Sequence, residues 1–281
     1  MTKHKLLLDE TLDFNKSEQY KMSILISKSG LSFVILDERA KKIIAHKHQE
    51  IEAFSNVKEY GFFINKIFNT DEFLKYQYKN LSIIYQSFKS ITIPQNLYVE
   101  EYKERFFELN LGINNNEIIL TNYLTRMGAV KLFAIPQVVY EAIDNLPQKV
   151  KIYHQSTAII QSALKNKFLE TVYINLNLDF FDIQVFDKKN LILDNSFKYK
   201  TKEDLLYYLL YTFEQLGLDV KNQKIILFAD FYIEESLIAF IQKYLGGIVL
   251  SRFPKVFSYS YLFLKKNSHR LATQILTLEC E

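Results

Sequence analysis

The amino-acid sequence predicts an α/β protein with two lobes, each built on a mixed five-stranded sheet. The element order βββαβα occurs twice along the 281 residues. Asp37 and Asp187 each end the second strand of their copy, and at this offset "FVILD" in the first copy lies over "IQVFD" in the second, sharing the final Asp. Three antiparallel strands followed by a right-handed crossover to a parallel strand give a mixed sheet in each lobe.

The first copy begins with three short strands that are rich in Ile, Val and Phe. We expect them at Met22–Ile26, Leu31–Leu36 and Lys42–His48, separated by the turns "SKSG" and "DERAK". A helix is expected around Val57–Tyr76, with a break at Asn69. The stretch "NLSIIYQSF" that follows is apolar on both faces, as is typical of a buried parallel strand.

The second copy repeats this order. Strands are expected at Thr171–Leu176, Phe180–Phe186 and Leu191–Phe197, with "DKKN" as the last hairpin turn. A helix over Lys202–Leu216, closed by a glycine, precedes the apolar strand "QKIILFAD" and a second amphipathic helix, Glu234–Leu245. This βββαβα order is the same as in the first copy.

The segment between the copies contains a strand pair, "EIILTNY" and "GAVKLFAI", and a short helix after Pro136. The strand "KVKIYH" and a helix capped by Ser156 follow. We place the domain boundary at the polar segment Lys165–Glu170. The first lobe is then 1–165, with an insertion around 92–130, and the second lobe is 166–281. Because no low-complexity linker separates them, the lobes are expected to pack together.

Composition excludes several functional classes. A net charge of +3, from 35 basic and 32 acidic residues, gives no reason to expect nucleic-acid binding. No apolar run approaches the ~18 residues of a membrane span, and a single cysteine, Cys280, is typical of the reducing cytosol. With only 7 glycines and no glycine-rich phosphate motif, the chain has few places for a phosphate-binding loop.

Two polar groupings have an ordinary structural interpretation. His46 and His48 lie on one face of a strand, but no second His or Cys pair accompanies them, so we expect a solvated strand face and no metal. His154 and Ser156 suggest a hydrolytic triad, but no nucleophile elbow supports one.

The stretch "NSFKYKTKEDLLYYLL" contains a capping box, Thr201-x-x-Asp204, before an apolar run. It therefore predicts the end of a strand and a capped crossover helix. Tyr207 and Tyr208 cannot both point into one core, so we expect at least one to be partly exposed at a lobe junction or another interface.

The doubled βββαβα plan resembles the actin/hexokinase/Hsp70 ATPase fold, whose lobes are ribonuclease H-like. The resemblance implies that the first hairpin of each lobe contacts phosphates and that ATP lies between the lobes. In closer detail the chain is similar to an uncharacterised bacterial family, domain of unknown function 3822. The stretches that carry this likeness are "GLSFVILD", "NSFKYKTKEDLLYYLL", "EQLGLD" and the pair "FAIP…YEAID".

The first phosphate hairpin of this ATPase fold reads Asp-x-Gly followed by Thr or Ser. In the corresponding stretch "ILISKSGLS", Ile26 stands in place of the Asp and Lys28 in place of the Gly. Only Ser27, Ser29 and Gly30 remain as small residues that the resemblance places at the phosphates.

The second hairpin departs from the ATPase pattern in the same way. In "NLNLDFFD", Asn175 and Asn177 replace the Asp and the Gly, and Phe180 and Phe181 replace two threonines. Only Asp182 persists.

The adenosine motif, which carries Gly-Gly in this fold, is Ala229-Asp230 in this chain. Asp179 and Asp230 place negative charge where a triphosphate binds, which disfavours the nucleotide unless a cation intervenes. Loss of a carboxylate at both hairpins removes groups that organise Mg²⁺ and the attacking water.

These departures predict a cytoplasmic, non-catalytic binding or scaffold protein, a pseudo-ATPase without a cofactor whose partner is another protein. The alternative is a nucleotide-binding protein in which an atypical phosphate site binds ATP without Mg²⁺, since Asn both donates and accepts hydrogen bonds. That site would consist of Ser27, Ser29, Gly30, Asn175, Asn177 and Asp182.

Overall fold

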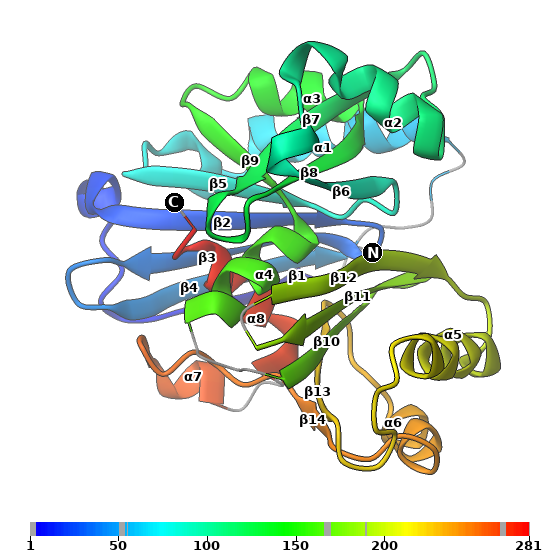
Figure 1. Cartoon of the computed structure of the whole chain (residues 1–281). Helices are drawn as coiled ribbons and strands as arrows, with labels where there is room; N and C mark the ends of the chain where they lie inside the picture. Colours follow the sequence, from blue (N-terminus) through cyan, green and yellow to red (C-terminus); the bar gives the residue numbers. More distant parts are fainter. Residues whose placement is uncertain are drawn as a thin grey trace.

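The computed structural model describes residues 4–50, 54, 56–165, 170–188, 190–264 and 268–280. These residues form three sheets, which have seven, five and three strands. In Figure 1 the first sheet crosses the middle of the molecule, the second lies below it to the right, and the third is above the first.

The first sheet has the strand order β1-β4-β3-β2-β5-β9, and β15 pairs with β4. The three expected hairpin strands are confirmed, and β5 lies parallel to β2, as a crossover requires. Two edge strands, β1 and β15, add to the five that were expected. The strands are β1 (His4–Leu8), β2 (Tyr20–Ser27), β3 (Gly30–Asp37), β4 (Lys42–Glu50), β5 (Asn80–Tyr85), β9 (Val150–His154) and β15 (Ser258–Tyr259).

Two helices, α1 (Val57–Thr70) and α3 (Gln137–Asp144), cover one face of this sheet and enclose its apolar core. The helix expected over Val57–Tyr76 ends at Thr70 and continues as a 3₁₀ turn, close to the predicted break. Together the sheet, α1 and α3 form what we call the first lobe. The 3₁₀ turns of the chain are η1 (Phe14–Gln19), η2 (Glu72–Lys75), η3 (Gln95–Leu97), η4 (Glu100–Tyr102), η5 (Thr125–Met127) and η6 (Ser268–Arg270).

The second sheet has the order β12-β11-β10-β13-β14, with β13 and β14 parallel to β10 and to each other. The helices α5 and α6 cover its outer face and, with it, form the second lobe. The expected order of elements is confirmed, and β14 completes the five strands. The elements are β10 (Glu170–Leu176), β11 (Phe180–Asp187), β12 (Asn190–Lys198), α5 (Lys202–Gln215), β13 (Lys224–Ala229), α6 (Glu235–Gln242) and β14 (Ile248–Leu250).

The capping box predicted at the start of α5 is present. The Asp204 N–H donates to Thr201 Oγ1, and the Thr201 N–H donates to Asp204 Oδ2, both at 3.1 Å. Gly217 follows the helix with φ 62°, a backbone conformation that favours glycine. The stretch "NSFKYKTKEDLLYYLL" is therefore the end of β12 followed by a capped helix, as expected.

The third sheet, with the order β6-β8-β7, and helix α2 form a small insertion with its own core around Phe107. The expected pair β7 and β8 is confirmed. The third strand, β6, was not predicted, because its pattern "SITIP" is short and ends in proline. The elements are β6 (Ser90–Pro94), α2 (Lys103–Leu111), β7 (Glu117–Leu124) and β8 (Ala129–Pro136).

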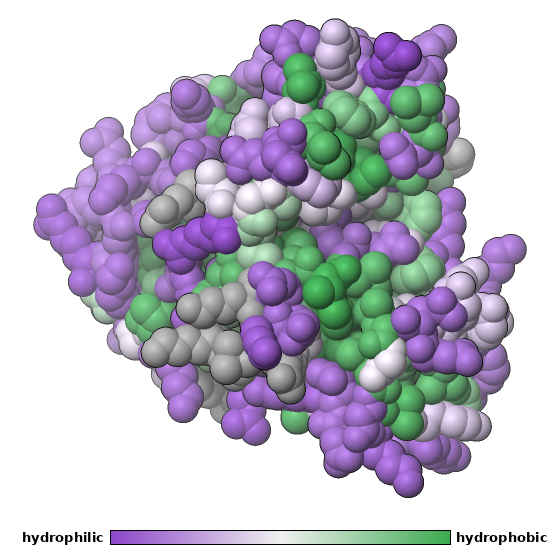
Figure 2. Space-filling model, viewed as in Figure 1, coloured by the Kyte–Doolittle hydropathy of each residue, from purple (hydrophilic) through white to green (hydrophobic). Residues whose placement is uncertain are grey.

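Helix α4 (Gln155–Lys165) runs from the first lobe to the second and packs against α8 (Ala272–Thr277). It begins at Gln155, so the prediction of Ser156 as its cap is wrong. The Ser156 hydroxyl lies 2.8 Å from His154 Nδ1 instead. Figure 2 shows hydrophobic side chains gathered in the middle of this face of the molecule, within a mainly hydrophilic rim.

The C-terminal segment, which follows the second sheet in the chain, contacts the first sheet. Beyond β15 and the short helix α7 (Tyr261–Leu264), α8 packs on β2 and β3, where Gln274 Nε2 donates to the Ser32 carbonyl at 2.9 Å. The domain boundary at Lys165–Glu170 stays a prediction, and residues 166–169 of this segment lie outside the described residues. No helix in the described part of the chain is long and apolar enough to cross a bilayer.

Candidate functional site between the lobes

The turn of the β2–β3 hairpin faces the end of β13 across the gap between the lobes. The Ser27 hydroxyl donates to Asp230 Oδ2 at 2.7 Å, and the Ser29 hydroxyl donates to the same oxygen. At the surface, Lys28 Nζ lies 2.5 Å from Asp179 Oδ2 on the second hairpin. The first hairpin therefore contacts both parts of the second lobe that the resemblance places around a nucleotide.

Gly30 has a structural reason to be glycine in this hairpin. Its φ is +152°, and a Cβ at this position would lie 2.3 Å from the Gln49 carbonyl oxygen of the neighbouring strand. Close pairing with the neighbouring strand therefore explains why this residue is glycine, and phosphate binding is not needed as a reason.

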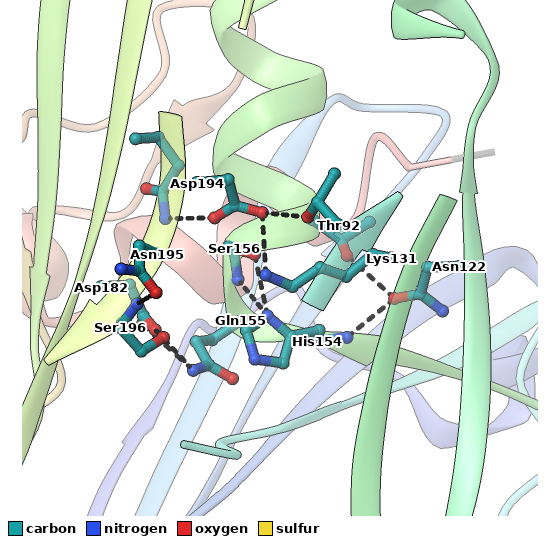
Figure 3. A network of polar contacts seen from close by, with 12 residues as sticks. Thr92, Asn122, Lys131, His154, Gln155, Ser156, Asp182, Asp194, Asn195 and Ser196 are labelled. Atoms are coloured by element: carbon teal, nitrogen blue, oxygen red, sulfur yellow. Dashed lines mark hydrogen bonds and ion pairs between the residues drawn. The ribbon is translucent and has the colours of Figure 1, made fainter. Parts of the chain in front are cut away.

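On the second hairpin, Asp182 is fully buried on β11 among four donors, of which Figure 3 shows Gln155 and Ser196. Gln155 Nε2 lies 3.0 Å and Asn175 Nδ2 3.2 Å from its Oδ2, and Asn177 Nδ2 lies 3.3 Å from the same oxygen. The Ser196 hydroxyl donates to Oδ1 at 2.7 Å. Burial raises the pKa of Asp182 to about 6, against the lowering effect of these hydrogen bonds.

Gln155 connects the two lobes at the start of α4. Its Nε2 donates to the Ser87 carbonyl at 2.9 Å and to Asp182, while its Oε1 accepts the Ser87 N–H at 3.0 Å. Its amide is fully hydrogen-bonded, so Gln155 links the end of β5 to the second sheet.

A buried ion pair joins the insertion to the second lobe. Lys131 Nζ on β8 lies 2.8 Å from Asp194 Oδ2 on β12, and the two side chains are 1% and 2% exposed. Thr92 and Gln184 also donate to this carboxylate, at 2.6 and 3.1 Å. Burial raises the pKa of Asp194, but the Lys131 ammonium more than offsets this, and the net effect is a lowered pKa.

The neighbouring His154 does not form a hydrolytic triad. It is fully buried, its Nε2 lies 2.9 Å from the Ser87 carbonyl, and its Nδ1 lies near Ser156. Burial, followed by the nearby Lys131 ammonium, lowers its pKa well below the ordinary value, so the ring is neutral. Because Ser156 is also fully buried, neither side chain is accessible to a substrate.

The two phenylalanines of the second hairpin face opposite sides of the sheet. Phe180 points toward the first lobe, where its ring centroid lies 5.7 Å from that of Phe88. Phe181 points into the core under α5. A ring therefore occupies the interlobe side at a position where the ATPase pattern has a threonine.

A small cavity of about 20 Å³ remains beside Asp230, between the C-terminal segment and the first sheet. His46, His48 and Arg270 are among the residues that line it. The interpretation of the two histidines as a solvated strand face is wrong for His46, which is 3% exposed, because the C-terminal segment covers this face. No group of three or more His, Cys, Asp or Glu residues suited to a metal ion occurs among the described residues.

The tyrosine pair lies on α5, at a distance from these contacts. Tyr207 is 62% exposed and stacks with Tyr211, whereas Tyr208 is half-buried and stacks on Phe197 of β12. Their assignment to an interface stays a prediction. Ala229 is buried at the end of β13.

Several site residues were missed at the sequence level, chiefly Lys131, Asp194 and Gln155. One signal was available: Lys131 interrupts the apolar strand "AVKLFAI", and a buried lysine needs a buried acid. Nothing in the local pattern identified Gln155, because its partners come from strands far away in the chain.

Comparison with known proteins identifies the family of the chain. A family model described as protein of unknown function (DUF3822) matches residues 9–248. The chain therefore belongs to this family. The resemblance to this family that "GLSFVILD" and the α5 segment indicated is thereby confirmed. No curated protein is detectably similar to it.

Solved structures show that the DUF3822 protein has the actin-like ATPase fold. A Bacteroides thetaiotaomicron protein with this fold and unknown function is 26% identical, with a TM-score of 0.80 over 96% of this chain and 100% of that one. The PilM–PilN type IV pilus biogenesis complex gives a TM-score of 0.63 at 8% identity, over 92% and 97%. The ethanolamine utilization protein EutJ from Carboxydothermus hydrogenoformans gives 0.52 at 7% identity, over 92% and 89%.

The raised pKa of Asp182 predicts a pH-dependent stability. The folded protein keeps this proton up to about pH 6, whereas an unfolded Asp loses it near pH 4, so stability falls as pH rises between these values, by up to ~3 kcal/mol. Urea unfolding between pH 4 and 7.5 measures it. Asp182→Asn, which cannot ionise, should lack this fall. The effect of His154, whose pKa also differs between the folded and unfolded states, is the same in both proteins and cancels in the difference. Parallel profiles for the two proteins would refute the assignment.

Proposed function

We propose that this protein is a non-catalytic binding or scaffold protein, a pseudo-ATPase whose interlobe site is filled by its own side chains in place of a nucleotide. The observation that carries the proposal is the pair of hydrogen bonds from Ser27 and Ser29 to Asp230. In the ATPase fold that the chain resembles, this hairpin donates to phosphate. A carboxylate of the second lobe accepts these hydroxyls here.

The second hairpin supports the same function. The side-chain amides of Asn175 and Asn177 donate to Asp182, within the protein, and Phe180 packs against Phe88. A triphosphate entering this space would displace these contacts and meet the Asp230 carboxylate, with like-charge repulsion. The cost of binding would therefore be high.

The buried carboxylates of the site are also already paired with groups of the protein itself, so they are not available as metal ligands. Asp182 accepts four side-chain donors, and Asp194 forms the ion pair with Lys131. A Mg²⁺ ion prefers carboxylate oxygens and water, and binding here would require breaking these pairs. This supports a protein without Mg²⁺-dependent hydrolysis, which acts by binding another protein in the bacterial cytosol.

Thermal unfolding with millimolar ATP, with and without Mg²⁺, tests the proposal. We expect an unchanged Tm in both conditions, because the side chains of the site are already hydrogen-bonded to one another. A ligand at ~100 times its Kd stabilises the folded state by about 2.7 kcal/mol, which gives a clear shift. A rise in Tm with ATP alone would overturn the proposal in favour of the atypical phosphate site that includes Gly30, and a rise only with Mg²⁺ would indicate a conventional nucleotide site.

A further inference from the structure

The edge strand β9 of the first sheet is covered on only half of its length. In a parallel strand each residue directs its N–H and C=O to the same side, and alternate residues point outward. Asn122 of β7 marks the outward side, because its Nδ2 donates to the Ile152 carbonyl and its Oδ1 accepts the His154 N–H, both at 2.9 Å. The side chain of Asn122 thus takes the place of a neighbouring strand at this end.

The other half of the edge has open backbone groups. Val150 and Ile152 have the same parity as His154, so both groups of Val150 and the N–H of Ile152 point outward. No hydrogen bond from another residue of the described ranges reaches these three groups. Open groups at a sheet edge pair readily with an extended chain.

An open groove of about 500 Å³ runs beside this half of β9. Its walls come from α3, the turn that follows it, and β9 itself. The apolar residues that line it are Tyr140, Ile143, Leu146, Pro147, Val150 and Ile152. The groove therefore offers an apolar surface on the same side of the sheet as Val150 and Ile152, which suits every second side chain of an added strand.

The charged residues on β9 and just before it are lysines, and the groove itself is lined by Asp144 of α3 as well as Lys149. Lys149 and Lys151 flank Val150, are exposed, and form no ion pair with any described carboxylate. Because side chains alternate along a strand, Lys151 points to the face opposite the groove. An added strand is therefore favoured when its residues next to these lysines are acidic.

We propose that β9 binds an extended peptide segment of a partner protein as an added strand, with apolar side chains in the groove and acidic side chains beside Lys149 and Lys151. The inference rests on the proposed function and names its binding surface. A second copy of this chain is disfavoured as the occupant, because two β9 strands would place lysine against lysine.

Fluorescence anisotropy with short labelled peptides tests the inference. The probes are a six-residue peptide of alternating Val and Glu and a matched peptide of alternating Val and Lys. The wild-type protein should bind the Val/Glu peptide about tenfold more tightly, given the worth of two cross-strand charge pairs. The double variant Lys149→Glu/Lys151→Glu should reverse this preference.

Two further variants separate strand addition from nonspecific peptide binding. Val150→Pro removes an outward N–H that makes no bond within the sheet, so it should abolish binding while Tm stays near the wild-type value. Tyr207→Ala, on the other lobe, should leave binding unchanged. The proposal is overturned if neither peptide binds saturably, if both bind equally, or if Val150→Pro binds as well as the wild type. Each of these results leaves the ATP experiment intact, so a failure here is distinct from a failure of the proposed function.

Discussion

Replacement of Lys131 by Met is expected to lower the free energy of unfolding by about 3–5 kcal/mol. The change removes the cation from a pair in which both side chains are almost completely buried, at 2.8 Å. The carboxyl group of Asp194 then loses its counter-ion in a low-dielectric site and retains Thr92 and Gln184 as donors. Urea unfolding at pH 7 measures the loss.

The matched control is Lys28→Met, which breaks a Lys–Asp pair between the first lobe and the second. Lys28 is 70% exposed and Asp179 is 45% exposed, so water screens this pair and the change should be below ~1 kcal/mol. Equal losses for the two variants would show that the Lys131–Asp194 pair is not buried in solution as it is in the structure.

Replacement of Phe181 by Ala is expected to destabilise the protein by about 3–5 kcal/mol. This ring is fully buried, 5.5 Å from the Phe197 ring and 6.2 Å from the Tyr199 ring. The result would establish that a hairpin position where the ATPase pattern has a threonine belongs to the hydrophobic core.

Leu178→Ala is the control in the same hairpin, since its side chain is 53% exposed. Its effect on chemical denaturation should stay within about 0.5 kcal/mol. A small loss for Phe181→Ala, comparable with the control, would contradict the packing described for this hairpin.

Local patterns predicted most of the fold because the decisive signals lie within short windows. Apolar runs identified β5 and β13, and the Thr201–Asp204 capping box identified the start of α5. The edge strands were missed for the opposite reason: β15 has two residues, and its partner β4 lies more than two hundred positions earlier in the chain.

The candidate site was predictable only in part. Ser27, Asn175 and Asp182 were named from the hairpin resemblance, and the structure brings them to the interlobe region. Their actual partners were not foreseen, because a hydrogen bond such as Ser27–Asp230 depends on how two distant hairpins dock. Sequence periodicity contains no information about such docking.

The distance between the lobes in solution tests most directly whether the interlobe site is closed by its own side chains. Spin labels at Lys66→Cys on α1 and Glu214→Cys on α5, in a Cys280→Ser background, report it by double electron–electron resonance. Both sites are exposed on helices of different lobes. We expect one narrow distance distribution that Mg²⁺ and ATP leave unchanged, because Ser27, Ser29 and Asp230 already close the site. A second population in the free protein, or a shift on adding the nucleotide, would contradict it.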